Sequence, residues 1–160
     1  MNQIENRLKT LGFTLPPPFP VPEAMQDYMC MARIIGDRCI LSGHAALNAD
    51  GSIAQPLGQV GRNVTPEEAN HAAHLTALAM IGTLKDKLGD LDRITAWVKV
   101  LGMVNAAPGF KDHTPVINGF SETIAQVFGP DIGRHARSAV GMASLPFDLP
   151  VEIEAEILFK

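Results

Sequence analysis

The sequence is short of the residues and runs that mark several classes of protein. It has two cysteines, too few for a disulfide framework. It has no block of lysines or arginines and a net charge of −4, whereas a nucleic-acid surface normally needs a basic stripe. No apolar run reaches membrane-spanning length, and the first residues lack the apolar core of a signal peptide. We therefore expect neither nucleic acid nor a membrane as a partner.

The composition that remains is that of one folded domain. The chain has 160 residues, of which 46% are apolar and 19% charged, enough to bury a core and too apolar for disorder. One Trp and one Tyr indicate a core built mostly from aliphatic side chains. Cys30 and Cys39 fall in or near one apolar segment, so we expect buried thiols and a cytoplasmic protein.

The N-terminal segment differs from the rest. Apolar residues at helical spacing predict a short helix over residues 2–11. Five prolines among residues 16–22 exclude a helix and predict an extended arm. This arm is either a connector laid on the surface, which we favour, or a segment that reaches a neighbouring subunit. We assign residues 1–27 to helix and arm, and 28–160 to the domain proper.

Caps and periodicity predict the elements of that domain. Gly36-Asp37 is a hairpin turn signal between two short strands. Thr65, Pro66 and Glu68 form the signature of a capping box with proline in the first turn. Thr114-Pro115 repeats the start signal for a second helix. The elements that follow the hairpin are a helix over 65–88, a strand over 94–105, a helix over 114–129 and strands over 137–143 and 151–157. This order predicts an α+β fold with two helices packed on one face of a sheet.

The strand over 137–143 presents a cation beside small residues. Side chains of a strand alternate between faces, so Arg137, Ala139 and Gly141 share one face. A guanidinium is always charged and binds a carboxylate through two hydrogen bonds. The face therefore suits a small carboxylate ligand. The alternative, which we favour from parity alone, is that Arg137 only pairs with a structural acid.

The strand over 151–157 alternates apolar residues with acids. Glu152, Glu154 and Glu156 share one face, and the simplest interpretation is a half-solvated strand. The functional alternative is that Glu152 lies beside Arg137 and orients water or transfers a proton. The prolines between the two strands predict a turn that makes the strands neighbours, which would bring the two side chains together.

Histidines offer a further set of candidates. His71 and His74 lie three residues apart on the first long helix and could share a metal with Glu67 or Glu68, but the chain supplies no convincing third ligand. We predict packed or surface histidines and no metal site. His135 shares a strand face with Arg137, so it either lines the same site or sits at an exposed strand end, which we prefer.

Three short segments carry a resemblance to a known family. The pattern Ala136-Arg137-Ser138-Ala139-Val140, then Leu145-Pro146, then Val151-Glu152-Ile153-Glu154-Ala155, resembles the signature of the YjgF/Rid family of reactive-intermediate deaminases, also called endoribonuclease L-PSP. Ser42-Gly43 resembles the Ser-Gly segment of that family, and Val104-Asn105-Ala106 its Val-Asn pair. The similarity covers about residues 28–158.

The resemblance implies a chorismate-mutase-like fold and a homotrimer with three clefts between subunits. It implies hydrolysis of 2-imino or enamine acids to 2-keto acids and ammonia, without a cofactor. Arg137 would hold the substrate carboxylate and Glu152 would assist water or proton transfer. The residues that would bind substrate are Ser42, Gly43, His44, Asn105, Tyr28 and Ala139.

The chain departs from the family pattern at several positions. Ala139 stands where Cys is frequent, His44 where Gln is common, and the segment between Asn105 and Arg137 is longer than in compact members. Three functions therefore stay open. They are an imine deaminase, a trimeric binder of small carboxylates without turnover, and an endoribonuclease or translation inhibitor. The acidic composition weighs against the third.

Overall fold

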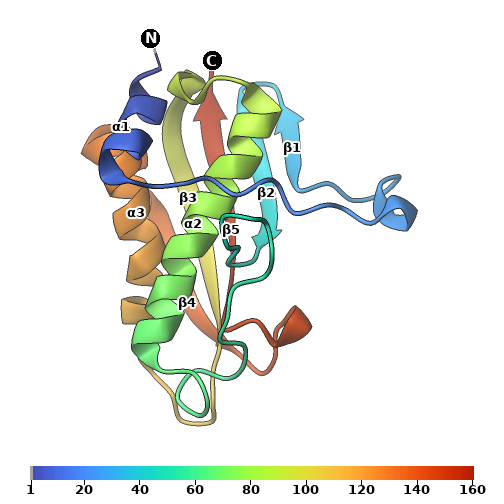
Figure 1. Cartoon of the computed structure of the whole chain (residues 1–160), viewed down its shortest axis with the longest axis vertical. Coiled ribbons are helices and arrows are strands. Elements are labelled where there is room, and N and C mark those ends of the chain that lie inside the picture. Colours follow the sequence, from blue (N-terminus) through green and yellow to red (C-terminus); the bar gives the residue numbers. More distant parts are fainter. Residues whose placement is uncertain (1) are drawn as a thin grey trace.

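The computed structural model describes residues 2–160 and confirms the α+β class (Figure 1). The predicted hairpin, both long helices and the three later strands are present in the predicted order. The elements are α1 Gln3–Leu11, η1 Glu23–Met25, β1 Ala32–Ile35, β2 Arg38–His44, α2 Pro66–Leu88, η2 Leu91–Arg93, β3 Ile94–Asn105, α3 His113–Gly133, β4 Ala136–Met142, η3 Pro146–Asp148 and β5 Val151–Phe159.

The five strands form one sheet in the order β1-β2-β5-β3-β4. Only β3 and β4 run parallel, because α3 carries the chain back between them, and the other pairs are antiparallel. The expectation that β4 and β5 are neighbours is wrong, because β3 lies between them. After η3 the chain crosses the end of β3 and pairs on its far side, next to β2.

Helices α2 and α3 cover one face of the sheet, which we call the helix-covered face (Figure 1). The opposite, open face carries no α-helix among residues 2–160. The capping box of α2 is formed as predicted: Thr65 Oγ1 accepts from the Glu68 N–H, and Glu68 accepts from the Thr65 N–H. The two helices approach closely at Gly119, where a Cβ would overlap the backbone oxygen of Asn70.

Helix α3 departs from its predicted bounds at both ends. It begins at His113 rather than after Thr114, and Asp112 precedes it without a side-chain cap. Pro115 therefore lies inside the first turn, where its missing N–H breaks no helical bond. Gly129 adopts φ 79° and ψ 170°, which interrupts the helix before a last turn up to Gly133.

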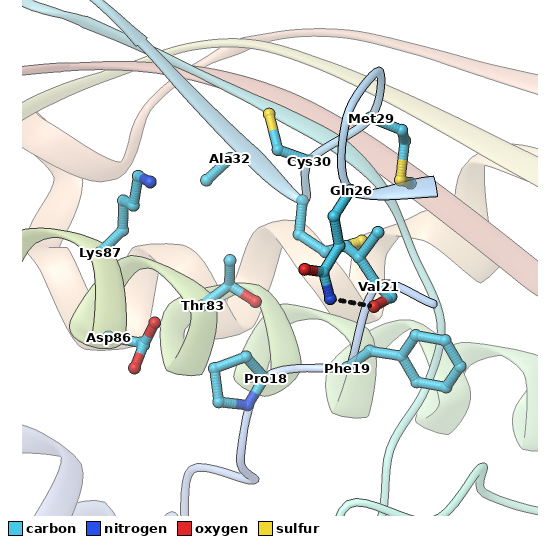
Figure 2. Close-up of a pocket in the computed structure, with 11 residues that line it drawn as sticks. Pro18, Phe19, Val21, Gln26, Met29, Cys30, Ala32, Thr83, Asp86 and Lys87 are labelled. Atoms are coloured by element: carbon cyan, nitrogen blue, oxygen red, sulfur yellow. Dashed lines mark hydrogen bonds between the residues drawn. The ribbon is translucent and has the colours of Figure 1, made fainter. Parts of the chain in front are cut away.

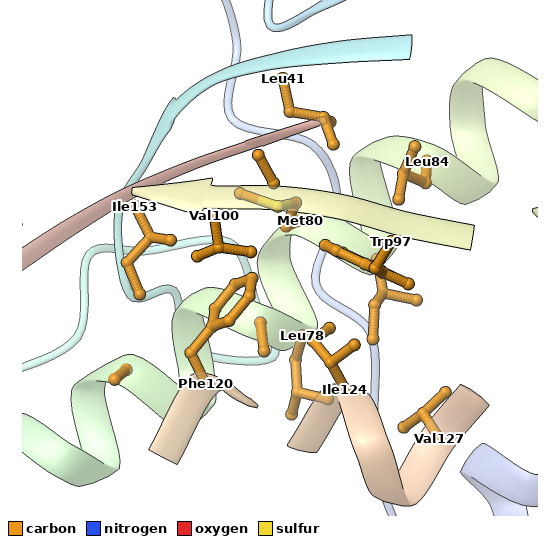
Figure 3. Close-up of a cluster of buried hydrophobic side chains, with 14 of the residues drawn as sticks. Leu41, Leu78, Met80, Leu84, Trp97, Val100, Phe120, Ile124, Val127 and Ile153 are labelled. Atoms are coloured by element: carbon orange, nitrogen blue, oxygen red, sulfur yellow. The ribbon is translucent and has the colours of Figure 1, made fainter. Parts of the chain in front are cut away.

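The core lies between the helices and the sheet (Figure 3). Trp97, on β3, is 2% exposed and contacts the rings of Phe120 and Phe128 on α3. The indole N–H of Trp97 has no hydrogen-bond partner among the described residues. Trp97 is thus a core residue, and its segment of β3 offers no ring to a neighbouring subunit.

The N-terminal helix belongs to the same core. Ile4 and Leu8 are buried in it, and the carboxylate of Asp92 accepts the N–H groups of Gln3 and Ile4. The arm then crosses α2, where a Cβ on Gly82 would meet the backbone oxygen of Pro16 at 2.5 Å. This part of the arm is a connector laid on its own chain. The division at residue 27 stays a prediction.

The two thiols differ in exposure. Cys39 is buried, as expected, and burial raises the pKa of its thiol. Cys30 is exposed, contrary to expectation, because it ends the projecting part of the arm rather than entering the sheet. No helix within residues 2–160 is long and apolar enough to cross a bilayer.

Three half-buried or buried imidazoles should make stability depend on pH. Burial is the main cause that lowers the pKa of His44, His74 and His135 below the usual 6.5. The unfolded chain then binds more protons below that pH, so stability is lost as pH falls. We expect the urea midpoint of unfolding to decrease as the pH is lowered from about 7 to about 5. His44 should contribute a loss of up to about 1.4 kcal/mol in the free energy of unfolding per pH unit. His44→Gln should flatten this slope. A midpoint independent of pH would contradict the prediction.

Candidate functional site

Arg137 lies on the helix-covered face of the edge strand β4. It pairs in register with Val100, which is fully buried beneath the helices, and cross-strand neighbours point to the same face. Its guanidinium reaches α3, where Nη1 donates to Ser121 Oγ at 3.0 Å. No acid forms an ion pair with Arg137 among the described residues. The prediction that Arg137 pairs with a structural acid is therefore wrong within this chain.

A short hydrogen-bond chain orients this guanidinium. His135 Nδ1 lies 2.7 Å from the Gly133 carbonyl, so Nδ1 carries the proton in the neutral ring. Nε2 then accepts from the Ser121 hydroxyl at 2.9 Å, and the Ser121 oxygen accepts from Arg137. Burial lowers the pKa of His135, and the nearby Arg137 lowers it further, which favours the neutral ring.

The hollow beside Arg137 has a volume of about 380 Å³, and Pro130, Arg134 and His135 also line it. His135 thus lies at the rim of the Arg137 site rather than at a free strand end. Sequence reasoning missed Ser121, because it lies on α3 and belongs to no motif. Only the packing of α3 on β4 brings it to the guanidinium.

Glu152 lies on the open face of the central strand β5. It pairs with Met103, whose other neighbour is Val140, while Arg137 pairs with Val100. Met103 and Val100 are three residues apart on β3, an odd separation that puts their side chains on opposite faces. Arg137 and Glu152 therefore point to opposite faces of the sheet. The expectation that one chain brings them together is wrong, for two reasons: β3 separates their strands, and their register places them on different faces.

The carboxyl of Glu152 lies against Gly43. A Cβ at Gly43 would overlap Glu152 Oε1, so only glycine leaves room for the acid there. Both residues line a hollow of about 290 Å³, the Glu152 pocket, with apolar side chains from the arm, the loop after β2 and η3. Burial, followed by repulsion from Glu154, raises the pKa of Glu152. A carboxyl with a raised pKa suits proton transfer near neutral pH.

Replacing Gly43 should displace that carboxyl. We expect Gly43→Ala to reduce any activity that depends on Glu152 by about a hundredfold, because misplacing a reacting group by about 1 Å has effects of that size. Added to Glu152→Gln, the same substitution should reduce activity no further, since the group it displaces is gone. Steady-state rates of the four chains measure this. If the losses caused by the two substitutions were additive, Gly43→Ala would act on something other than the Glu152 carboxyl.

Ser42 and His44, on either side of Gly43, bond to other parts of the chain, and a substrate contact of Ser42 stays a prediction. The Ser42 hydroxyl donates to the Cys30 carbonyl at 2.7 Å and ties the end of the arm to β2. His44 is 2% exposed, with Nδ1 on the Ser42 carbonyl and Nε2 on Thr83 of α2. The expectation that His44 lines the cleft is wrong for this chain, because a bulge in β2 turns its ring into the core.

Asn105, Ala139 and Tyr28 lie apart from one another. Asn105 is 1% exposed and donates from Nδ2 to Asp148, which holds η3 beside the Glu152 pocket. Ala139 follows Arg137 on the helix-covered face. Tyr28 is 75% exposed on the arm. A direct substrate contact stays a prediction for all three.

The pair His71 and His74 shows no metal-binding arrangement. The rings stack at 5.7 Å, and His74 Nδ1 is bonded to Thr123 Oγ1 at 2.7 Å. Neither belongs to a group of three potential ligands within residues 2–160. The favoured alternative, packed or surface histidines, fits this geometry, because His74 is partly buried and His71 is exposed.

A larger hollow of about 530 Å³ lies between the arm and α2 (Figure 2). Thr83, Asp86 and Lys87 of α2 face Cys30 and Gln26 across it, and Gln26 donates to the Val21 carbonyl. None of the predicted site residues lines this hollow. It offers one exposed thiol without a histidine beside it, so size alone does not make it the candidate site.

Comparison with known proteins decides the family. The model described as "YjgF/chorismate_mutase-like, putative endoribonuclease" matches residues 5–151. The chain belongs to the YjgF/Rid family. The match extends into the N-terminal helix and arm, beyond the segments that carried the resemblance.

Relatives of this YjgF/Rid protein support the same fold. Protein TCP17 of Trypanosoma cruzi is 37% identical over 96% of this chain and 92% of its own. A crystal structure of a protein of unknown function from Agrobacterium tumefaciens is 41% identical, with a TM-score of 0.86 over 98% of this chain and 94% of its own. E. coli TdcF, solved with bound serine, is 17% identical, with a TM-score of 0.58 over 91% of this chain and 94% of its own, and shares the fold.

Proposed function

We propose that this protein hydrolyses 2-imino acids to 2-keto acids and ammonia in a cleft between subunits. The observation that carries the proposal is the placement of two complementary half-sites on opposite faces. A guanidinium without an ion pair among residues 2–160 lies on the β4 edge strand, and a half-buried carboxyl of raised pKa lies on the open face. A second copy is needed to bring Arg137 of one chain to Glu152 of the next. The serine bound to TdcF supports a ligand of amino-acid size.

The chemistry needs no more than these groups. Arg137 binds the substrate carboxylate with the N–H donors that Ser121 does not occupy. The protonated imine is already electrophilic, so water attacks its carbon while the Glu152 carboxylate accepts the water proton. Protonated Glu152 then donates to the nitrogen of the carbinolamine. The C–N bond breaks and ammonia leaves. The Glu152 carboxylate accepts the hydroxyl proton as the keto group forms and passes it to the departing ammonia, which leaves as ammonium.

A homotrimer is the assembly we propose. Exposed apolar side chains lie on the open face, including Ile35 and Ile40 of the hairpin and Val140 and Met142 of the edge strand β4. Such a face is expected to meet another surface. The two free thiols support a reducing compartment, the cytoplasm.

The first experiment is imine hydrolysis. An amino-acid oxidase generates 2-imino acids in situ, semicarbazide competes for the imine, and the protein is compared with Arg137→Ala. We expect faster imine loss with the wild type and a reduction of about a hundredfold or more in the variant, since it loses a charged bidentate contact. Arg137→Lys is the matched control, because lysine keeps the positive charge but lacks the paired N–H donors of the guanidinium. Its activity should lie between the two.

Two results would redirect the proposal. Binding of small carboxylates that depends on Arg137, without faster hydrolysis, would make the protein a binder. The family description includes endoribonuclease, so the same preparations should be incubated with RNA. Cleavage that is lost in Glu152→Gln and weakened by salt would favour that activity instead.

A further inference from the structure

We infer that the arm makes this protein selective for 2-imino acids with an apolar side chain, which the Glu152 pocket would hold. The inference rests on the proposed function, because it names the substrate class of that site. It concerns residues 19–31, to which the proposed mechanism assigns no role.

The walls of the pocket are apolar almost throughout. Arm residues Val21, Met25 and Met29 face Ile53 and Leu149 across it, and Glu152 is the only charged or polar side chain among the described residues that line it. An acidic or hydroxylated substrate side chain would lose its water here, and the one polar side chain, Glu152, is occupied by the proposed proton transfer. An apolar side chain gains from burial.

The position of the pocket links it to the reaction. Glu152 lines it with its carboxyl against Gly43, so a substrate whose imine carbon lies near that carboxyl has its side chain at the pocket. The carboxylate end of the substrate must point the other way, toward an arginine of the next subunit. The pocket volume of about 290 Å³ is larger than a methyl side chain would fill and approaches the volume of typical small-molecule binding sites.

One segment that lines the pocket, η3, has strained backbone. Phe147 has φ 56° and Asp148 φ 57°, a left-handed conformation that is rare for an aromatic residue. Asn105 holds Asp148 through its side chain, and the Gly58 N–H binds the Asp148 carbonyl. Phe147 is 67% exposed and lines the pocket. The methionines of the arm are flexible, so the pocket should accept several apolar shapes.

The test compares imines of alanine, leucine, phenylalanine and aspartate in the oxidase assay. We expect kcat/KM for the leucine and phenylalanine imines to exceed that for the alanine imine by about tenfold or more, with the aspartate imine poorest. Met25→Lys places a cation in the half-exposed wall of the pocket. It should raise the ratio of kcat/KM for the aspartate imine to kcat/KM for the leucine imine by about tenfold. Leu11→Lys, a similar change on α1 outside the pocket, should leave the ratio unchanged.

Failure of the inference and failure of the proposed function give different results. Hydrolysis of all four imines at equal rates, or fastest for alanine, would overturn the inference and leave the deaminase intact. If the protein accelerates hydrolysis of none of the imines, isothermal titration calorimetry with the stable 2-keto acid products tests the pocket instead. Tighter binding of 4-methyl-2-oxopentanoate than of pyruvate or oxaloacetate, lost in Met25→Lys, would support the apolar pocket. Equal or absent binding would overturn it.

Discussion

Refolding an equal mixture of the Arg137→Ala and Glu152→Gln chains is expected to restore about one quarter of wild-type imine hydrolysis. Each variant alone should be inactive, because every cleft lacks either the carboxylate anchor or the proton-transfer group. In the mixture, half of the clefts receive a wild-type Arg137 and, independently, half receive a wild-type Glu152. The recovery follows from the opposite faces on which one chain carries the two residues.

The control for this complementation is the chain that carries both substitutions. Refolded alone or with either single variant, it should restore nothing, since one wild-type half-site is then always missing. Mass measurement of the mixed oligomers shows whether the chains have exchanged. Exchanged oligomers without activity would mean that the two residues do not serve one cleft between subunits.

Trp97→Ala should cost about 3–5 kcal/mol of the free energy of unfolding, because it empties the centre of the core between β3 and α3. That is a large part of the 5–15 kcal/mol typical of a whole domain. The change should appear as a lower urea midpoint. Unfolding must be followed by circular dichroism rather than by tryptophan fluorescence, because Trp97 is the only tryptophan of the chain.

Trp97→Phe is the matched comparison. It keeps an aromatic ring against Phe120 and removes an indole N–H that has no partner, so it avoids the penalty of breaking a hydrogen bond. We expect less than about half of the loss seen with alanine. An alanine variant within about 1 kcal/mol of the wild type would show that the ring is not the core contact the structure indicates.

Much of the fold could be predicted because its signals are local. The capping box at Thr65, the turn at Gly36 and the β-rich run of 94–105 each act within a few residues, and all three appear as predicted. The start of α3 is the exception among these local signals. Proline is tolerated throughout the first turn of a helix and not only at its first position, so Pro115 does not fix where the helix begins.

The candidate site was only partly predictable. The alternation within each strand was right: Arg137 shares a face with Ala139, and Glu152 with Glu154. Whether those two faces are the same face of the sheet depends on strand order, which no short segment contains. Likewise, nothing near His44 signals the bulge that turns its ring into the core.

The sequence by itself determined the class of fold and the family, and it named the two residues of the proposed half-sites, because caps, periodicity and short motifs depend on neighbouring residues. Only the tertiary structure decided which residues meet. It inserted β5 between β2 and β3, placed Arg137 against Ser121 of α3, and brought the arm to Glu152. These contacts join segments far apart in the chain, and pairing and packing of whole elements fix them.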